Sequence, residues 1–136
     1  MNAQELRSAV TRWATGQADV RAVVLVGSHA RGDARPDSDI DLVILCTDPA
    51  KYLRALTWLS TFGAVQSTEI EDWGEVQSVR AFYSDGLEVE FGLTSDDWAT
   101  CSLDTGTLEV LAGGAMILLD RDGRLAQAIE SLPQSR

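Results

Sequence analysis

The chain has 136 residues, of which 45% are hydrophobic and 24% are charged, and its formal net charge is −10 at pH 7. This composition is typical of one folded domain over residues 1–136 and excludes a largely disordered chain. The acidic charge disfavours strong nucleic-acid binding because it repels a phosphate backbone, and the lack of a long apolar run or a signal-peptide core predicts a cytoplasmic protein that does not enter membranes.

Hydrophobic periodicity predicts helices and strands along the whole chain. The first helix carries Leu6, Val10, Trp13 and Ala14 on one face, and the second begins with Asp48 as its N-cap. Since strands and helices are mixed, we expect an α+β fold: a mixed, largely antiparallel β-sheet flanked by helices that pack mostly on one side. The predicted elements are a helix at 2–15, strands at 20–26 and 39–46, a helix at 49–62, strands at 64–70, 75–83 and 87–93, a short helix ending at Trp98, a helix at 107–112, a strand at 115–119 and a helix at 124–132.

A polar stretch with glycine follows the first predicted strand, GSHARGDARPDS. Gly27 allows the backbone to approach a phosphate closely, and free N–H groups at the start of a helix attract anions. The hydroxyl of Ser28 adds one more donor. An ordinary tight turn has the same two residues, so the turn indicates phosphate binding only together with a second feature.

That second feature is the pair Asp39 and Asp41, which begins the next strand. Alternate side chains of a strand share a face, so these two carboxylates project together while Ile40 and Leu42 enter the core. Two neighbouring carboxylates repel each other unless a cation lies between them. Mg²⁺ prefers oxygen ligands and retains positions for substrate phosphates, so it is the natural candidate.

The chain resembles the DNA polymerase β-like nucleotidyltransferase superfamily in two segments, GSHARG at 27–32 and SDIDL at 38–42. The shared pattern is a hydrophobic residue before Gly-Ser, roughly a dozen residues, and then Asp-hydrophobic-Asp-hydrophobic. The resemblance is closest to small bacterial members, the minimal nucleotidyltransferases and the aminoglycoside-adenylylating enzymes. It covers residues 23–45, with looser agreement to about residue 93, and implies the polymerase β-like fold.

The resemblance also implies a third acid on a later strand beside the first two. In LEVEF, Glu88 and Glu90 share one face of a strand. Glu90, which an aromatic residue follows, matches the third acid best, and Glu88 is the alternate. Such an acid completes a metal shell and accepts a proton from the acceptor hydroxyl.

Two arginines are candidates for contact with phosphates. If Ser84-Asp85-Gly86 is a three-residue loop with Gly86 left-handed, Arg80 lies opposite Glu90, where it can contact phosphates or steady that acid. Arg31 can reach a phosphate or fix its own loop through Asp33 or Asp37. His29, the only histidine, is expected to face solvent.

The function that the resemblance implies is Mg²⁺-dependent transfer of a nucleoside monophosphate from a nucleoside triphosphate to an acceptor hydroxyl, with release of pyrophosphate. ATP is the expected donor. Asp39, Asp41 and Glu90 would bind one or two Mg²⁺ ions, and Gly27 and Ser28 would bind the β and γ phosphates.

The acceptor stays open, between a small molecule and a protein. The alternative function is an antitoxin-type minimal nucleotidyltransferase that acts through a helical protein partner, a HEPN-type toxin. Residues 94–136 could form an acceptor lid or a partner-binding extension, and a second copy of the chain in a homodimer could also complete the acceptor site.

Overall fold

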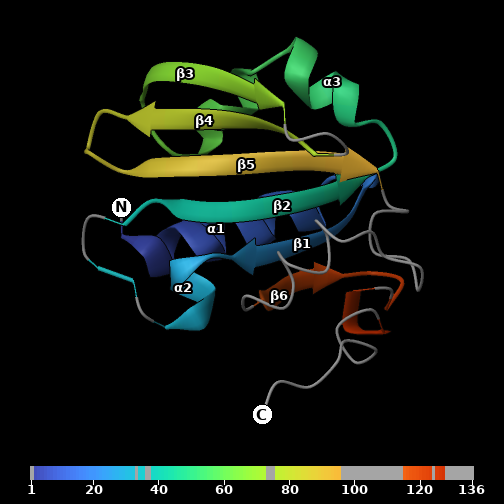
Figure 1. Ribbon diagram of the computed structural model, residues 1–136. Coiled ribbons are helices and arrows are strands. Elements are labelled where there is room, and N and C mark those ends of the chain that lie inside the picture. The colour runs from blue at the N-terminus through green and yellow to red at the C-terminus, as the bar shows by residue number, and fades with distance from the viewer. Residues whose placement is uncertain are drawn as a thin grey trace.

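The computed structural model describes residues 2–32, 34–35, 38–72, 76–95, 115–123 and 125–127. Six strands form a single sheet in the order β3-β4-β5-β2-β1-β6 (Figure 1). The elements are α1 (Ala3–Thr15), β1 (Val20–Val26), α2 (Ser28–Arg31), β2 (Ile40–Cys46), α3 (Pro49–Arg54), the 3₁₀ helix η1 (Thr57–Phe62), β3 (Val65–Asp72), β4 (Gln77–Tyr83), β5 (Glu88–Ser95) and β6 (Ala115–Asp120).

The sheet is mixed. β2 and β5 are parallel neighbours at its centre, although more than forty residues separate Asp41 from its register partner Glu90. The other four pairs of neighbouring strands are antiparallel. The predicted α+β class with a mixed, largely antiparallel sheet is therefore confirmed.

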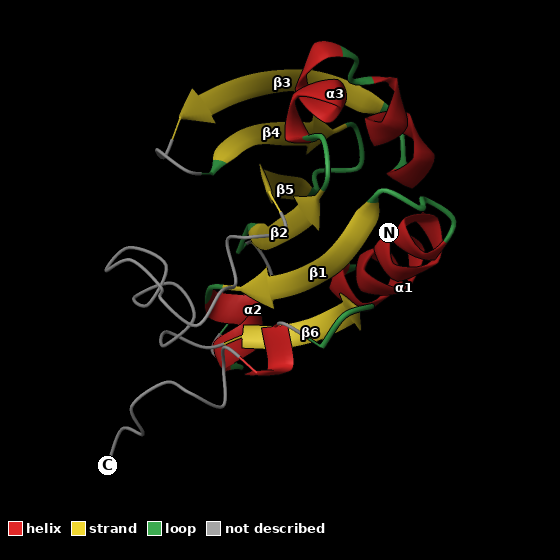
Figure 2. Cartoon of the chain, turned by 90° about the vertical axis from the view of Figure 1, so that its right-hand side faces the viewer, coloured by secondary structure: helices red, strands yellow, loops and turns green. Residues whose placement is uncertain are grey.

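Helices α1 and η1 lie on one side of the sheet (Figure 2), and Tyr52 of α3 joins the same core. The predicted apolar face of α1 packs there: Leu6, Val10 and Ala14 are at 0% exposure, and Trp13 is partly buried against the same core. A capping box begins α1, in which Asn2 accepts from the backbone N–H of Glu5 and the Glu5 carboxylate accepts from that of Asn2. The apolar stripe and the cap together explain why this segment is a helix.

Alternation along β2 separates the two faces of the sheet. Ile40, Leu42 and Ile44 pack into the core beneath the helices. Asp41 lies between Ile40 and Leu42 and therefore points to the opposite face, as the sequence predicts. The face that α1 does not cover thus carries the functional side chains. No helix in the described part of the chain is long and apolar enough to cross a membrane.

The prediction of a single helix over residues 49–62 is wrong. The α-helix ends at Arg54, because Ala55 has extended backbone angles (φ −133°, ψ 114°), and a separate 3₁₀ helix follows. After this break the indole Nε1 of Trp58 donates to the carbonyl of Tyr52, and its ring stacks on Trp13 with centroids 5.2 Å apart. Aromatic packing with a distant helix thus overrides local helix propensity.

The remaining predicted elements match within a few residues where the structure describes them. The strand predicted at 64–70 continues to Asp72, and the one predicted at 115–119 continues to Asp120. The helices predicted up to Trp98 and over 107–112 lie outside the described residues, and only 125–127 of the helix at 124–132 is described, as helix.

The predicted hairpin register is confirmed. Tyr83 donates its N–H to the carbonyl of Leu87, which closes a three-residue loop in which Gly86 has a φ of 93°. As a result, Arg80 on β4 is the register partner of Glu90 on β5.

Candidate active site

Three polar side chains follow one another across the middle of the sheet. Asp41 on β2 is the parallel register partner of Glu90 on β5, and Glu90 is the antiparallel partner of Arg80 on β4. Register partners on one face have neighbouring side chains, so the sheet aligns two carboxylates and a guanidinium. Asp39 comes directly before β2 and lies beside this row.

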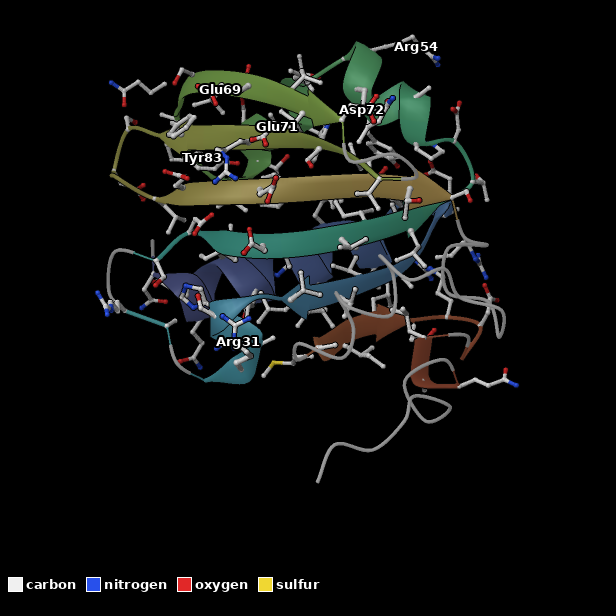
Figure 3. All side chains as sticks on the ribbon, in the orientation of Figure 1. Arg31, Arg54, Glu69, Glu71, Asp72 and Tyr83 are labelled. Atoms are coloured by element: carbon white, nitrogen blue, oxygen red, sulfur yellow. The ribbon has the colours of Figure 1, made fainter. Side chains whose placement is uncertain are left out.

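The guanidinium of Arg80 lies among four carboxylates. Its Nη1 is 2.6 Å from Glu88 Oε2 and 2.9 Å from Asp39 Oδ2. Its Nε is 3.1 Å from Glu71 Oε1, and its Nη2 is 3.5 Å from Glu90 Oε1. Figure 3 shows Glu71 on β3, the edge strand next to β4.

The Arg80 side chain is only 19% exposed. Burial by itself would lower its pKa, but hydrogen bonds to Asp39, Glu71 and Glu88 raise the pKa well above its ordinary value. Arg80 is therefore a fixed positive charge that holds these acids together.

Asp41 has the most perturbed carboxyl group of the site. Its pKa is raised from 3.8 to about 7, chiefly by burial and also by the charge of Asp39 and a hydrogen bond to Glu90, while the charge of Arg80 lowers it. The positive charge of Arg80 is therefore not enough to keep the pKa of the buried Asp41 carboxyl group at its ordinary value. Such a group in a cluster of acids is a candidate for ligand binding or catalysis.

Gly27 lies directly against Asp41. Its backbone angles, φ 76° and ψ −156°, are in a region that side chains exclude, and a Cβ there would be 2.5 Å from Asp41 Oδ2. The register of β1 and β2 explains this contact, because Val26 is the partner of Asp41. The predicted phosphate turn and the predicted acid pair are therefore in contact, and Ser28 begins α2 next to them.

The donor chemistry of the site suits Mg²⁺, since Asp39, Asp41 and Glu90 supply the hard oxygen atoms that this ion prefers. Among the described residues, however, no three such side chains are already arranged around a common metal position. The carboxylate of Asp39 is instead paired with Arg80.

Two other residues considered in the sequence, Arg31 and His29, belong to α2. Arg31 is an exposed residue of α2, and Asp33 and Asp37, its predicted partners, lie outside the described residues (Figure 3). The prediction that His29 faces solvent is wrong: it is half-buried, and its Nε2 lies 3.3 Å from the Ser38 carbonyl oxygen. This contact ties α2 to the segment before β2.

Sequence reasoning missed Glu71. The predicted strand ended at Ile70, two residues too early, so Glu71 was not placed on the face that carries Arg80. Its alternation with Glu69 on a strand paired with β4 is the signal that could have identified it.

Comparison with known proteins identifies the family. A family model described as streptomycin adenylyltransferase matches residues 1–135. A search of curated protein sequences found no match.

Among solved structures, an aminoglycoside 6-adenyltransferase from Bacillus subtilis aligns with a TM-score of 0.59 at 17% identity, over 73% of this chain and 37% of that one. The polymerase core of the TRAMP RNA surveillance complex (TM-score 0.46, 17% identity, 65% and 28% of the two chains) and Cid1 poly(U) polymerase (0.42, 18%, 66% and 27%) are more distant. The chain thus spans well under half of each of these proteins. It belongs to the streptomycin adenylyltransferase family, which confirms the nucleotidyltransferase superfamily expected from its motifs.

Proposed function

We propose that this protein is a Mg²⁺-dependent nucleotidyltransferase that uses ATP as the donor. The observation that carries the proposal is the contact between three predicted parts: Gly27 lies against Asp41, and Asp41 is the register partner of Glu90. Membership of the streptomycin adenylyltransferase family supports the same chemistry.

In the proposed mechanism Asp39 and Asp41, with Glu90, hold Mg²⁺, which when bound neutralises phosphate charge and orients the triphosphate. The turn at Gly27 and Ser28 binds the β and γ phosphates through backbone N–H groups and the hydroxyl. Arg80 and Arg31 supply positive charge to the phosphates.

Glu90 accepts the proton of the acceptor hydroxyl. The acceptor oxygen forms a bond to the α phosphorus, and the bond from that phosphorus to the β-phosphate bridging oxygen breaks, so that pyrophosphate leaves in line. The protein contributes mainly positioning and charge compensation, which is typical of phosphoryl-group chemistry.

The acceptor is a small molecule or a protein with a free hydroxyl. The net charge of −10 favours a cationic acceptor. We propose that residues 94–136, of which 94–95, 115–123 and 125–127 are described, contribute to the acceptor side, as a lid or as the surface for a second copy or a helical partner protein.

Pyrophosphate release tests this proposal. The purified protein is incubated with Mg²⁺ and each nucleoside triphosphate, against a panel of hydroxyl compounds that includes aminosugars and against proteins that co-purify with it from its native cell. Release that depends on acceptor and is lost in Asp39→Ala supports transferase activity. Stoichiometric co-purification with a helical protein and no turnover of any small molecule would instead favour the antitoxin function.

A further inference from the structure

One nitrogen of Arg80 is shared between two acids that have different places in the proposed site. Nη1 donates to Asp39 Oδ2 at 2.9 Å and to Glu88 Oε2 at 2.6 Å. Asp39 belongs to the proposed metal ligands, whereas Glu88 is bound to Arg80 and is not the register partner of Asp41. A guanidinium held in this way competes directly with a metal ion for Asp39.

Arg80 also has an anchor on the other side. Its Nε donates to Glu71 Oε1 at 3.1 Å, and Glu71 comes from β3, on the far side of β4 from the aspartates. Loss of the bond to Asp39 would therefore leave Arg80 with two charge-assisted hydrogen bonds, to Glu71 and Glu88, and with its ion pair to Glu90 at 3.5 Å. The guanidinium can release Asp39 without moving away.

Exposure shows which partner an incoming ion would reach. The Asp39 side chain is 39% exposed, whereas that of Arg80 is 19% exposed. An ion from solvent therefore has access to the carboxylate of Asp39, while the guanidinium of Arg80 stays bound to Glu71 and Glu88.

We propose that Arg80 is the resident counter-ion of Asp39, that Mg²⁺ takes Asp39 from it, and that Glu71 and Glu88 then keep Arg80 in place beside the donor phosphates. This inference rests on the proposed function, because it takes Asp39 as a metal ligand. It makes Glu71 and Glu88 positioning residues and assigns the third-acid role to Glu90.

The first test measures Mg²⁺ binding by isothermal titration calorimetry without nucleotide. Arg80→Gln removes the competitor, so it is expected to bind Mg²⁺ about fivefold to tenfold more tightly than the wild type. The matched control is Arg54→Gln, which removes the same charge from an arginine that is 69% exposed on α3 and pairs with Asp48 at 3.7 Å (Figure 3). This control is expected to bind as the wild type does.

A second pair of variants separates competition from long-range electrostatics, and it is also informative if Arg80→Gln does not fold. In Glu88→Gln the Nη1 of Arg80 donates to Asp39 alone and competes more strongly with Mg²⁺. The Mg²⁺ affinity of this variant is therefore expected to be at least about threefold lower than that of Glu69→Gln. Glu69 is the right control because it is the register partner of Arg80 on β3 and, among the described residues, forms no ion pair with it.

A spectroscopic readout follows the anchor itself. The ¹⁵N–¹H signal of Arg80 Nε, assigned with Arg80→Lys, is expected to stay slow in exchange when Mg²⁺ saturates the protein, because the bond to Glu71 persists. The signal is expected to be lost in Glu71→Gln and kept in Glu69→Gln.

Two outcomes would overturn the inference while the proposed function stands: equal Mg²⁺ affinity in folded Arg80→Gln and the wild type, or equal affinities in Glu88→Gln and Glu69→Gln. Absence of Mg²⁺ binding in the wild type and in every variant, with or without ATP, would overturn the inference and the proposed function together.

Discussion

The backbone of Gly27 touches the carboxyl group of Asp41, so closely that a Cβ on Gly27 would be 2.5 Å from Oδ2. This contact joins the end of β1 to the start of β2, and it brings the proposed phosphate turn to the proposed metal ligands. The proposed phosphate binding and the proposed metal binding therefore both depend on the absence of a side chain at Gly27.

Gly27→Ala is therefore expected to damage the site and the fold together. The φ of 76° with a ψ of −156° strains any side chain, and the methyl group would displace Asp41, so we expect a loss of about 2–3 kcal/mol of stability and of most Mg-ATP binding. The matched control is Gly32→Ala, at φ 81° with no atom within 4 Å of its Cβ, which should lose only about 1 kcal/mol and keep binding. Urea denaturation and calorimetry measure both quantities, and equal effects of the two substitutions would contradict the contact.

Asp41 predicts how stability depends on pH in the absence of metal. Its pKa is raised to about 7, so between about pH 4 and pH 7 the folded protein holds a proton that the unfolded chain has released. The contribution of Asp41 to the free energy of unfolding therefore falls as the pH rises through this window, and it is lowest above the window.

Asp41→Asn removes this effect, so in the presence of EDTA it is expected to stabilise the protein by about 2 kcal/mol at about pH 8 and by much less at about pH 4.5. Urea denaturation at the two pH values measures the difference. A stabilisation of the same size at both would show that the Asp41 proton is not linked to folding.

Glu90 and Glu88 are expected to differ in kinetics, although they share a face of β5. Glu90 is the neighbour of Asp41, whereas Glu88 holds Arg80. With an acceptor found in the screen, Glu90→Gln should lower kcat by about 10²–10⁴-fold because the proton acceptor is lost, and Glu88→Gln by about tenfold or less. The reverse order would make Glu88 the third acid.

Arg121 is expected to stabilise the fold away from the site. Its Nη2 donates to the carbonyls of Ala14 and Thr15 in the last residues of α1, and its Nε donates to that of Val20. Arg121→Ala should lower the free energy of unfolding by about 1–2 kcal/mol. Arg12→Ala is the control: it removes a positive charge from the last turn of the same helix and should cost only a few tenths of a kcal/mol, by urea denaturation.

Sequence patterns were sufficient to predict the strands and turns that neighbouring residues in the chain determine. The strand at 20–26 was predicted to the residue because all of its residues except Arg21 are apolar, and these are buried on both faces. The loop length at Gly86 predicted the opposition of Arg80 and Glu90 correctly, since a hairpin loop determines register.

Features that depend on distant parts of the chain were not predictable in this way. The break at Ala55 accompanies the packing of Trp58 on Trp13, which lies in another helix. The ion pairs of Arg80 with Asp39 and Glu71 depend on strand order, and no local pattern encodes the parallel neighbours β2 and β5. Only the family resemblance led us to expect a third acid beside Asp41.

The most direct test of the central claim is the binding of Mg-ATP by calorimetry to the wild type, Asp39→Ala and Asp41→Ala, with folding checked by circular dichroism. We predict Mg²⁺-dependent ATP binding by the wild type and its loss in both folded variants. Binding of Mg-ATP by both variants with the affinity of the wild type would contradict the assignment of Asp39 and Asp41 as the metal-nucleotide site.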